Sequence, residues 1–593
     1  MVRVKMLRDR LHVDIGNVWK HIEILCTFPD RIAGTENIGK ASRYIIDYLE
    51  KINGSEVWIE RFPFLTSFPI ESYFELIEPE VKPIDCFPNL FSENTSDEGI
   101  IGEIVYLGGG SEEAYRGKDC KDKFVLVELS YSPPRTEKAK IASVNKANAL
   151  IVMNWGHREN RIVGKGAIKG VWGVPTREDI ERIPKIVSIN ISRFDGEYIK
   201  TLLSKSRKVK GRIKVKVRNE WIYSNQPMCR INSSNSEFKK EFIIVGGHLE
   251  AWGRTATDNS AGNAIMLEMA RVFSENKDKL LRSLLFGFWD GHEIGEAAGS
   301  AYFVDYYWSD LNSGGVSYVN IDGCGLAGAS RFVSYSSPET WKFLEEVEKD
   351  VIGGPSEKRV PLKFGDNSFL GIGIPYIFTF ATYREDELDK LGGAIFGLWY
   401  HSEEDTIDKI DKDLLEIHAR LYMEYVLRLA CMPMLPFDFT KFTEVVKKDI
   451  VEIKKVFSEH LFTSHICKLE EEIDELEKKL IEINKLSKEY GDQYDPHDLP
   501  FIRSVNQLLF KLSRILNPAF RTTVDKYSHD VYGCWYLSKP LPRIYKVLDK
   551  MVKIHKEEWE NHALKIELIR QYNILHDSLL DAISLCRNFL NNL

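Results

Sequence analysis

The sequence has few cysteines, and they are widely separated. It contains nine, an odd number, and no two of them form a Cys-x-x-Cys pair. Disulfide-stabilised secreted domains carry an even number of closely spaced cysteines, and cysteine-ligated zinc sites use paired ones. We therefore expect neither a disulfide framework nor a zinc site built from cysteines.

Long apolar runs and blocks of one charge are also missing. No segment approaches about 18 uninterrupted apolar residues, so no membrane span is expected. The net charge of −8 is modest for 593 residues, and no Lys/Arg-dominated stretch indicates a nucleic-acid partner. The stretch MVRVKMLRDRLHVDIG at the start lacks the features of a signal peptide. These absences predict a cytoplasmic protein that binds neither nucleic acid nor membranes.

The composition is that of a globular protein, and the length predicts about three domains at roughly 100–200 residues each. Residues 1–65 have a helical pattern followed by an extended one. Residues 66–222 alternate short strands with turns, which indicates a separate β-rich module. Residues 223–435 alternate strands with helices, and residues 436–593 are helical.

The alternation in residues 223–435 predicts an α/β domain with a mostly parallel sheet. The apolar segments EFIIVGG, SLLFGFW and GVSYVNID are the expected strands, and SAGNAIMLEMARVF is an expected helix between the first two. Active sites of such sheets lie at the carboxyl ends of the strands. We therefore look for functional side chains directly after each strand.

The helical region contains an apolar seam with heptad spacing over about two and a half heptads. A helical hairpin within the chain explains this seam, and packing against a second chain explains it as well; we favour the hairpin. The seam consists of Ile466, Leu469, Ile473, Leu476, Leu480 and Ile483.

Histidines and carboxylates follow the expected strands, and no cysteine accompanies them. This is the ligand set of a hydrolytic zinc site, in which a carboxylate can bridge two metal ions. Each residue alone has a simpler explanation, such as a helix N-cap for Asp258 or a turn for Asp322. Their joint occurrence in one domain favours the metal site. The candidates are His248, Asp258, Asp290, His292, Glu293, Asp322 and His401.

Several segments resemble motifs of the zinc aminopeptidase and glutamate carboxypeptidase II family, and they occur in the family's order. They are GGHLEAWGRTATDNSAGNAIMLEMAR, FWDGHEIGEAAGS, VNID, GDNSFLGIGIP and YHSEEDT. Residues 66–222 resemble the protease-associated domain that is inserted in many members. The segment SHDVYGCWYLSKPLPRIYKVL resembles the helical domain of the branch that includes the transferrin receptor.

The resemblance implies a fold of three parts. Residues 1–65 and 223–435 would form the zinc-exopeptidase domain, a phosphorylase/hydrolase-like three-layer α/β sandwich. Residues 66–222 would form the inserted protease-associated domain, and residues 436–593 a helical domain that implies a homodimer.

The resemblance also implies two Zn²⁺ ions per chain. His248 and Asp322 would bind one ion, Glu293 and His401 the other, and Asp258 would bridge them. A hydroxide between the ions would attack the peptide bond. Asp366 and Asp405 lie in family-like segments, and we expect them to support the ligands rather than to bind metal.

Three positions depart from the family pattern. The general base of the family is a glutamate, but His292 occupies that position; it either transfers the proton or is inert or an additional ligand. Glu250 replaces the aspartate that steers the first histidine, and it either retains that role or is a solvated side chain. Val531 replaces a lysine beside Tyr532, which either donates a hydrogen bond to the substrate or packs in the core.

These features together predict a zinc-dependent exopeptidase that acts on peptides, most readily an aminopeptidase. Glu250 and Asp290 are candidate anchors for the free amine of the substrate. The alternatives are a carboxypeptidase or dipeptidase of the same family, and a receptor-like binding protein with a weakened site. The retention of a competent ligand at all five metal positions argues against the last alternative.

Overall fold

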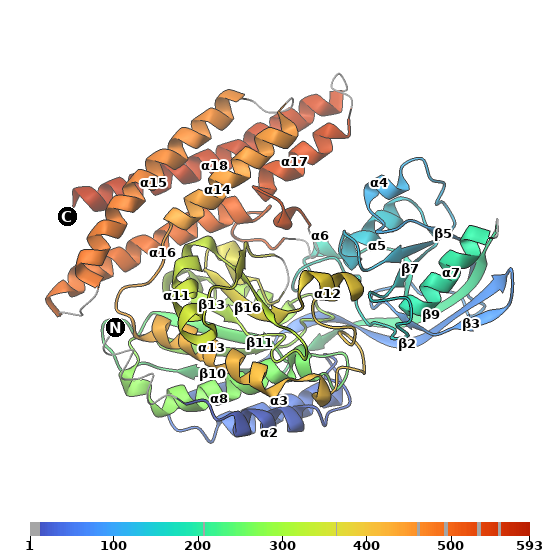
Figure 1. Cartoon of the computed structure of the whole chain (residues 1–593), viewed down its shortest axis with the longest axis horizontal. Coiled ribbons are helices and arrows are strands. Elements are labelled where there is room, and N and C mark those ends of the chain that lie inside the picture. Colours follow the sequence, from blue (N-terminus) through green and yellow to red (C-terminus); the bar gives the residue numbers. More distant parts are fainter. Residues whose placement is uncertain are drawn as a thin grey trace.

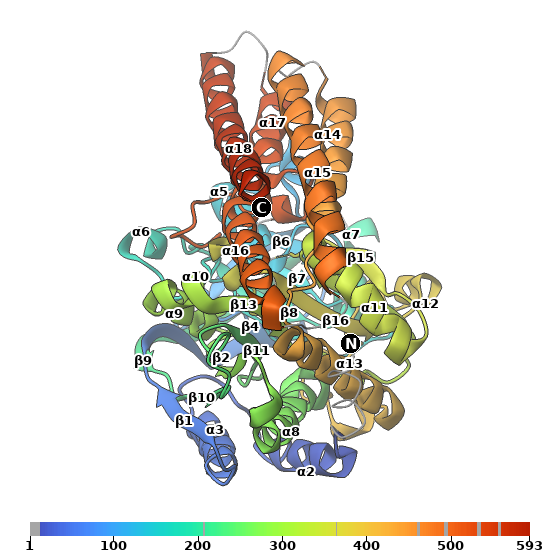
Figure 2. The same ribbon diagram turned by 90° about the vertical axis from the view of Figure 1, so that its left-hand side faces the viewer.

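The protein is described from a computed structural model that covers residues 12–205, 208–362, 365–458, 463–491, 496–530, 535–554 and 559–592. It has three parts (Figure 1). A mixed sheet covered by helices forms the lower left of that view, a second sheet lies to its right, and a bundle of long helices lies above. The bundle projects upward from the rest of the molecule when it is viewed from the side (Figure 2).

The first sheet has eight strands in the order β1-β10-β12-β11-β13-β16-β14-β15. Its centre is parallel: β12 pairs with β11, β11 with β13, and β13 with β16. The flanking pairs β1-β10, β10-β12 and β14-β16 are antiparallel. The predicted α/β fold with a mostly parallel sheet is therefore confirmed. The strands are β1 (Ser55–Glu60), β10 (Gln226–Ile231), β11 (Phe242–His248), β12 (Ser283–Trp289), β13 (Gly315–Asn320), β14 (Arg331–Ser336), β15 (Glu357–Arg359) and β16 (Tyr376–Thr382).

Helices cover both faces of this sheet, because alternate residues of each strand point to opposite sides. In β11, Ile243 and Val245 belong to the core beneath one helical layer, whereas Phe242 and Ile244 belong to the core of the other face. The first layer contains α2 (Ile15–Leu25), α3 (Glu36–Leu49), α8 (Ala261–Glu275), α11 (Trp341–Ile352) and α13 (Lys412–Cys431), and the second contains α9 (Ala298–Tyr306) and α10 (Trp308–Gly314).

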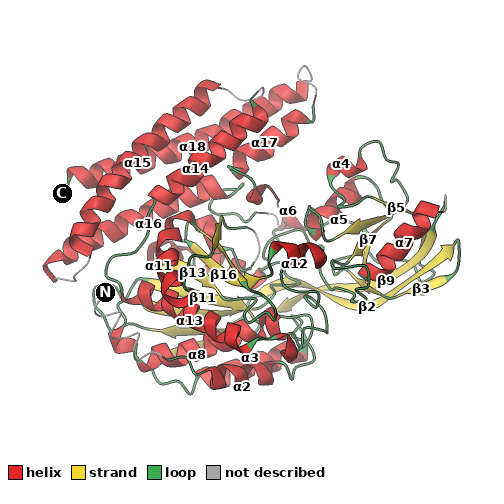
Figure 3. Cartoon of the chain, viewed as in Figure 1, coloured by secondary structure: helices red, strands yellow, loops and turns green. Residues whose placement is uncertain are grey.

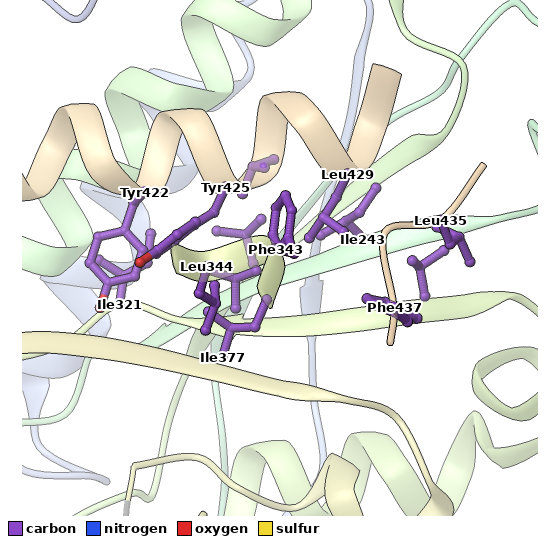
Figure 4. Close-up of a cluster of buried hydrophobic side chains, with 14 of the residues drawn as sticks. Ile243, Ile321, Phe343, Leu344, Ile377, Tyr422, Tyr425, Leu429, Leu435 and Phe437 are labelled. Atoms are coloured by element: carbon purple, nitrogen blue, oxygen red, sulfur yellow. The ribbon is translucent and has the colours of Figure 1, made fainter. Parts of the chain in front are cut away.

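Helix α13 shows how one layer is anchored. Asp411 caps its start by accepting a hydrogen bond from the backbone N–H of Leu414. Tyr422 and Tyr425 of the helix point toward the sheet, where they meet Ile377 and neighbouring apolar side chains (Figure 4). Burial of such side chains contributes about 1.5–3 kcal/mol each to the stability of the layer.

The second sheet also has eight strands, in the order β3-β2-β9-β5-β6-β7-β8-β4. Its longest strands, β2 and β9, are antiparallel partners and connect it to the first sheet. Strands β5 to β8 are parallel neighbours, and α5 (Arg135–Val144) and α7 (Arg193–Lys205) connect successive strands. The strands are β2 (Pro63–Glu78), β3 (Lys82–Ile84), β4 (Cys86–Pro88), β5 (Ile100–Tyr106), β6 (Phe124–Glu128), β7 (Ala149–Met153), β8 (Val187–Ile191) and β9 (Lys210–Tyr223).

The C-terminal part consists of long helices (Figure 3). These are α14 (Thr440–Phe457), α15 (Thr463–Gly491), α16 (Leu499–Arg521), α17 (Pro542–Val552) and α18 (Trp559–Asn591). The apolar seam of α15, from Ile466 to Ile483, is buried against neighbouring helices of the same chain, chiefly α18 and α14. The seam therefore packs within the chain, as favoured. Within the described ranges, every helix is too short or too polar to span a bilayer.

Glu339 links the first helical layer of the first sheet to the C-terminal bundle, and we expect stability there to depend on pH. It lies in the turn before α11, and its Oε1 accepts a hydrogen bond of 2.7 Å from Nδ2 of Asn517 in α16. The side chain is fully buried, and this burial raises the pKa of its carboxyl from 4.5 to about 7. A carboxyl with a raised pKa in the folded state stabilises the fold at low pH, and that contribution is lost as the pH rises through this window.

We therefore expect Glu339→Gln to stabilise the protein at pH 8 but not at pH 5. The glutamine keeps the acceptor for Asn517 and removes the cost of ionisation, which amounts to about 2–3 kcal/mol between the two pH values. Urea unfolding of variant and wild type at both pH values measures the difference. Glu346→Gln, at an exposed position of α11, is the matched control. An equal effect of Glu339→Gln at both pH values would contradict the assignment.

Candidate metal centre

His248 is the last residue of β11, at the carboxyl end of the parallel centre of the sheet. Its Nδ1 lies 2.7 Å from the backbone carbonyl oxygen of Glu250. Donation of the Nδ1 hydrogen to this carbonyl fixes the tautomer and leaves Nε2 as the free nitrogen. Nε2 lies 3.0 Å from Oδ1 of Asp258 and 3.4 Å from Oδ1 of Asp322, the second residue after β13.

Asp258 lies in the turn before α8, and a second buried carboxylate holds that turn. Oδ1 of Asp405 accepts hydrogen bonds from the backbone N–H and the hydroxyl of Thr257, and Oδ2 accepts one of 3.0 Å from the N–H of Asp258. The side chain of Asp258 accepts no helix-capping hydrogen bond. The N-cap explanation of Asp258 is therefore wrong, and its carboxylate is free to face His248 and His401.

His401 approaches from the opposite side of Asp258. Its Nε2 lies 3.1 Å from Oε2 of Glu293 and 3.6 Å from Oδ2 of Asp258. The backbone of Lys165, in the segment that contains the second sheet, makes two contacts with His401. The carbonyl of Lys165 lies 3.2 Å from Nδ1 of His401, and its N–H donates to the carbonyl of His401.

The five predicted ligands thus converge, although they come from segments far apart in the sequence. Ligand atoms of His248, Asp258 and Glu293 lie within 4.8 Å of one another. Buried polar atoms ordinarily have hydrogen-bond partners. Here, several buried atoms of the cluster make no hydrogen bond within the described chain: Nε2 of His248, Nε2 of His401, Oδ2 of Asp258 and Oε1 of Glu293. Imidazole and carboxylate groups left in this state fit a zinc ion.

The charges of these groups depend strongly on one another. Burial disfavours the imidazolium of His248, but Asp322 and Asp258 outweigh burial and raise its pKa well above the ordinary value. Burial likewise opposes the carboxylate of Glu293, yet His401 lowers the pKa of that group. Burial raises the pKa of Asp258, with Glu293 adding to the effect. Carboxylates crowded in this way without cations are costly, and a bound cation offsets that cost.

His292 lies beside the cluster rather than in it. Its ring stacks on His248 with ring centres 4.2 Å apart and an angle of 16°. Its Nδ1 lies 3.3 Å from Oδ1 of Asp366. The residue also lines the pocket next to the ligands, so it is placed to contact a substrate.

Glu250 does not steer His248 with its side chain, which corrects the prediction from the sequence. The carboxylate is fully buried, which raises its pKa to about 8, and it accepts hydrogen bonds from the N–H groups of Ala33 and Glu293. Glu250 thus holds the loop of Glu293, and its backbone carbonyl orients His248. The extra methylene of glutamate lets the carboxylate reach past the histidine.

Asp290 also turns away from the cluster. Its Oδ1 accepts a hydrogen bond from the N–H of Gly291, and its own N–H donates to Gln226. Neither Asp290 nor Glu250 is among the described residues that line the pocket, so neither is placed to bind a substrate amine there. Tyr532 and Val531 lie outside the described residues.

The pocket beside the ligands has a volume of about 360 Å³ and lies between the two sheets. Its wall is largely aromatic and aliphatic, and includes Trp155, Tyr335 and Phe396. Two charged residues that sequence reasoning missed, Arg135 and Glu296, also line it. Arg135 lies in α5, which belongs to the second sheet, and no local sequence pattern connects it with the ligands. Glu296 lies within the FWDGHEIGEAAGS stretch, whose spacing could have identified it.

Comparison with known proteins shows that the segment containing the cluster resembles a known family. Residues 228–426 match the model of peptidase family M28. The human transferrin receptor protein 2 is 28% identical over 240 residues, which cover 35% of this chain and 29% of that protein. The Arabidopsis thaliana protein named probable glutamate carboxypeptidase AMP1 is 23% identical over 587 residues, covering 85% of this chain and 80% of its own. The chain thus spans less than a third of the length of the human transferrin receptor protein 2.

A solved structure has the same fold in its peptidase part. The zinc aminopeptidase BSAP from Bacillus subtilis superposes with a TM-score of 0.54 at 21% identity, covering 71% of this chain and 96% of that chain. The matched family segment, residues 228–426, contains each of the five converging ligands. The chain therefore contains a segment, residues 228–426, that matches peptidase family M28.

Proposed function

We propose that the chain is a zinc-dependent exopeptidase, and that it acts as an aminopeptidase on peptide substrates. The observation that carries the proposal is the convergence of two imidazole nitrogens with the carboxylates of Asp258, Glu293 and Asp322. The match of residues 228–426 to family M28 and the fold shared with the zinc aminopeptidase from Bacillus subtilis support the reaction class and the metal.

Two zinc ions suit this arrangement of ligands. His248 and Asp322 would hold one, Glu293 and His401 the other, and Asp258 faces both histidines and would bridge the pair. When bound, such ions polarise a carbonyl group and lower the pKa of water. Glu250 and Asp405 hold the backbone of the ligands Glu293 and Asp258 in place.

His292 supplies the proton transfer that hydrolysis needs. Because its Nδ1 is buried against Asp366 while the residue lines the pocket, Nε2 is the nitrogen that can accept a proton from the attacking water. The same nitrogen can then protonate the leaving amine. The neutral imidazole accepts the proton as a general base, and the imidazolium that forms donates it as a general acid.

A carboxypeptidase or dipeptidase is the second candidate, and Arg135 favours it. Its guanidinium lines the pocket, and guanidinium groups bind carboxylates with paired hydrogen bonds. The C-terminal carboxylate of a peptide is one such group. The aromatic wall suits a large apolar side chain in either orientation of the substrate.

Blocked peptides distinguish these candidates. We expect free and C-terminally amidated peptides with a large apolar first residue to be cleaved, N-acetylated ones to resist, and a chelator to abolish cleavage. Cleavage of N-acetylated peptides at an undiminished rate, with amidated ones resistant, would instead identify a carboxypeptidase. Less than about one zinc per chain, together with no cleavage of any peptide, would favour a receptor-like protein.

A further inference from the structure

We propose that Asp366 is a positioning residue for His292, so that the two form a His–Asp pair that takes the place of a single catalytic carboxylate. The inference rests on the proposed function, in which His292 transfers the proton. It adds a residue that holds the imidazole in the tautomer and orientation required for that step.

The carboxylate of Asp366 is buried beside the imidazole of His292. The side chain is fully buried, and within the described residues neither of its oxygens makes a hydrogen bond. A buried carboxylate without partners is costly. The basic group at its side is the imidazole of His292, whose buried Nδ1 lies 3.3 Å from Oδ1.

The ring of His292 is confined from a second side. His248 stacks on its face at 4.2 Å, so the ring cannot rotate freely without losing that contact. With Asp366 at Nδ1, the hydrogen of the neutral ring is drawn to Nδ1 and Nε2 is left with its lone pair. An aspartate that orients a catalytic histidine in this manner is known from serine hydrolases. The 3.3 Å separation is longer than a charge-assisted hydrogen bond, as is common before substrate binds.

The loop that carries Asp366 is itself held in place. Trp172 donates a hydrogen bond of 2.8 Å from Nε1 to Oγ of Ser368, and Ser300 shares a hydrogen bond of 2.8 Å with the same hydroxyl. Trp172 belongs to the segment of the second sheet, whereas Ser300 lies in α9 just after the loop of His292. The two segments therefore fix the position of Asp366 relative to His292.

A double-mutant cycle tests the pair. We expect Asp366→Asn to lower kcat about 10- to 100-fold with a smaller change in KM and unchanged zinc content. In the His292→Gln background, the same change should cause no further loss, because the two residues act as a unit. Equal losses in both backgrounds would contradict the proposal. Asp386→Asn, at an exposed position of α12 (Glu385–Lys390), is the matched control.

A measurement that does not need activity separates this proposal from the proposed function. In protein labelled with ¹⁵N-histidine, the signals absent from His292→Gln belong to His292. We expect them to report the Nδ1–H tautomer in the wild type and a different tautomer in Asp366→Asn. An unchanged tautomer would overturn the role of Asp366 even in an active enzyme. If the tautomer changes as expected but the protein hydrolyses no peptide, the His292–Asp366 pair is supported and only the proposed exopeptidase function is rejected.

Discussion

Replacing Asp258 by asparagine should abolish nearly all peptide hydrolysis and release bound zinc. The carboxylate lies between the two histidines, with Oδ1 3.0 Å from His248 and Oδ2 3.6 Å from His401. An asparagine of the same shape has no charge and presents one oxygen instead of two, so it cannot bridge two cations. We expect kcat/KM to fall at least about 10³-fold, equivalent to ~4 kcal/mol of transition-state stabilisation.

Measuring the zinc content shows whether activity is lost because the metal is lost. Purified Asp258→Asn should hold clearly less zinc than the wild type, and added zinc should restore little activity. The exposed Asp386 on α12 provides the same chemical change without a metal-facing carboxylate, and Asp386→Asn should retain both zinc and activity. A fully loaded and active Asp258→Asn protein would show that the metal binds elsewhere.

The ligands could be predicted because strand ends are visible in the sequence. The apolar runs that became β11, β12 and β13 are each followed by a polar residue, and parallel strands bring these positions to one edge of a sheet. His248, Glu293 and Asp322 follow from this rule. Polar residues also follow the antiparallel flanking strands β10 and β14, but none of the five predicted ligands is among them.

Contacts between the two sheets could not be predicted in the same manner. The backbone carbonyl and N–H of Lys165 contact Nδ1 and the carbonyl of His401, 236 residues further along the chain, and nearly every residue has such backbone groups to offer. Arg135 reaches the pocket from α5, and nothing around it in the sequence distinguishes it from a surface arginine. Loop geometry brings these residues to the site, and short-range patterns do not encode that geometry.

Glu250 shows a second limit, which concerns side-chain direction. Its spacing from His248 correctly places it near the ligand, but spacing does not determine the rotamer. The carboxylate binds the N–H of Glu293, and the carbonyl of the same residue takes over the contact with His248. The residue acts on two ligands at once, through its side chain on one and its backbone on the other.

His292→Ala should retain zinc and lose most of its activity. None of the ligand atoms in the cluster belongs to His292, so the metal ligands remain, while the group that accepts the proton is removed. General acid–base catalysis contributes about 10²–10⁴-fold, and we expect kcat to fall within that range. His562→Gln, at an exposed position of α18, is the control for a histidine outside the site.

A third variant, His292→Glu, separates proton transfer from other roles of this residue. A carboxylate is also a general base, so it should recover a substantial part of the activity lost in His292→Ala, although Asp366 would then repel it. If His292 only packs against His248, glutamate should be no better than alanine. If His292 is inert, the alanine variant should keep full activity, and the assignment of the base would be wrong. Steady-state kinetics of the three proteins at equal zinc content therefore decides whether an imidazole performs this step.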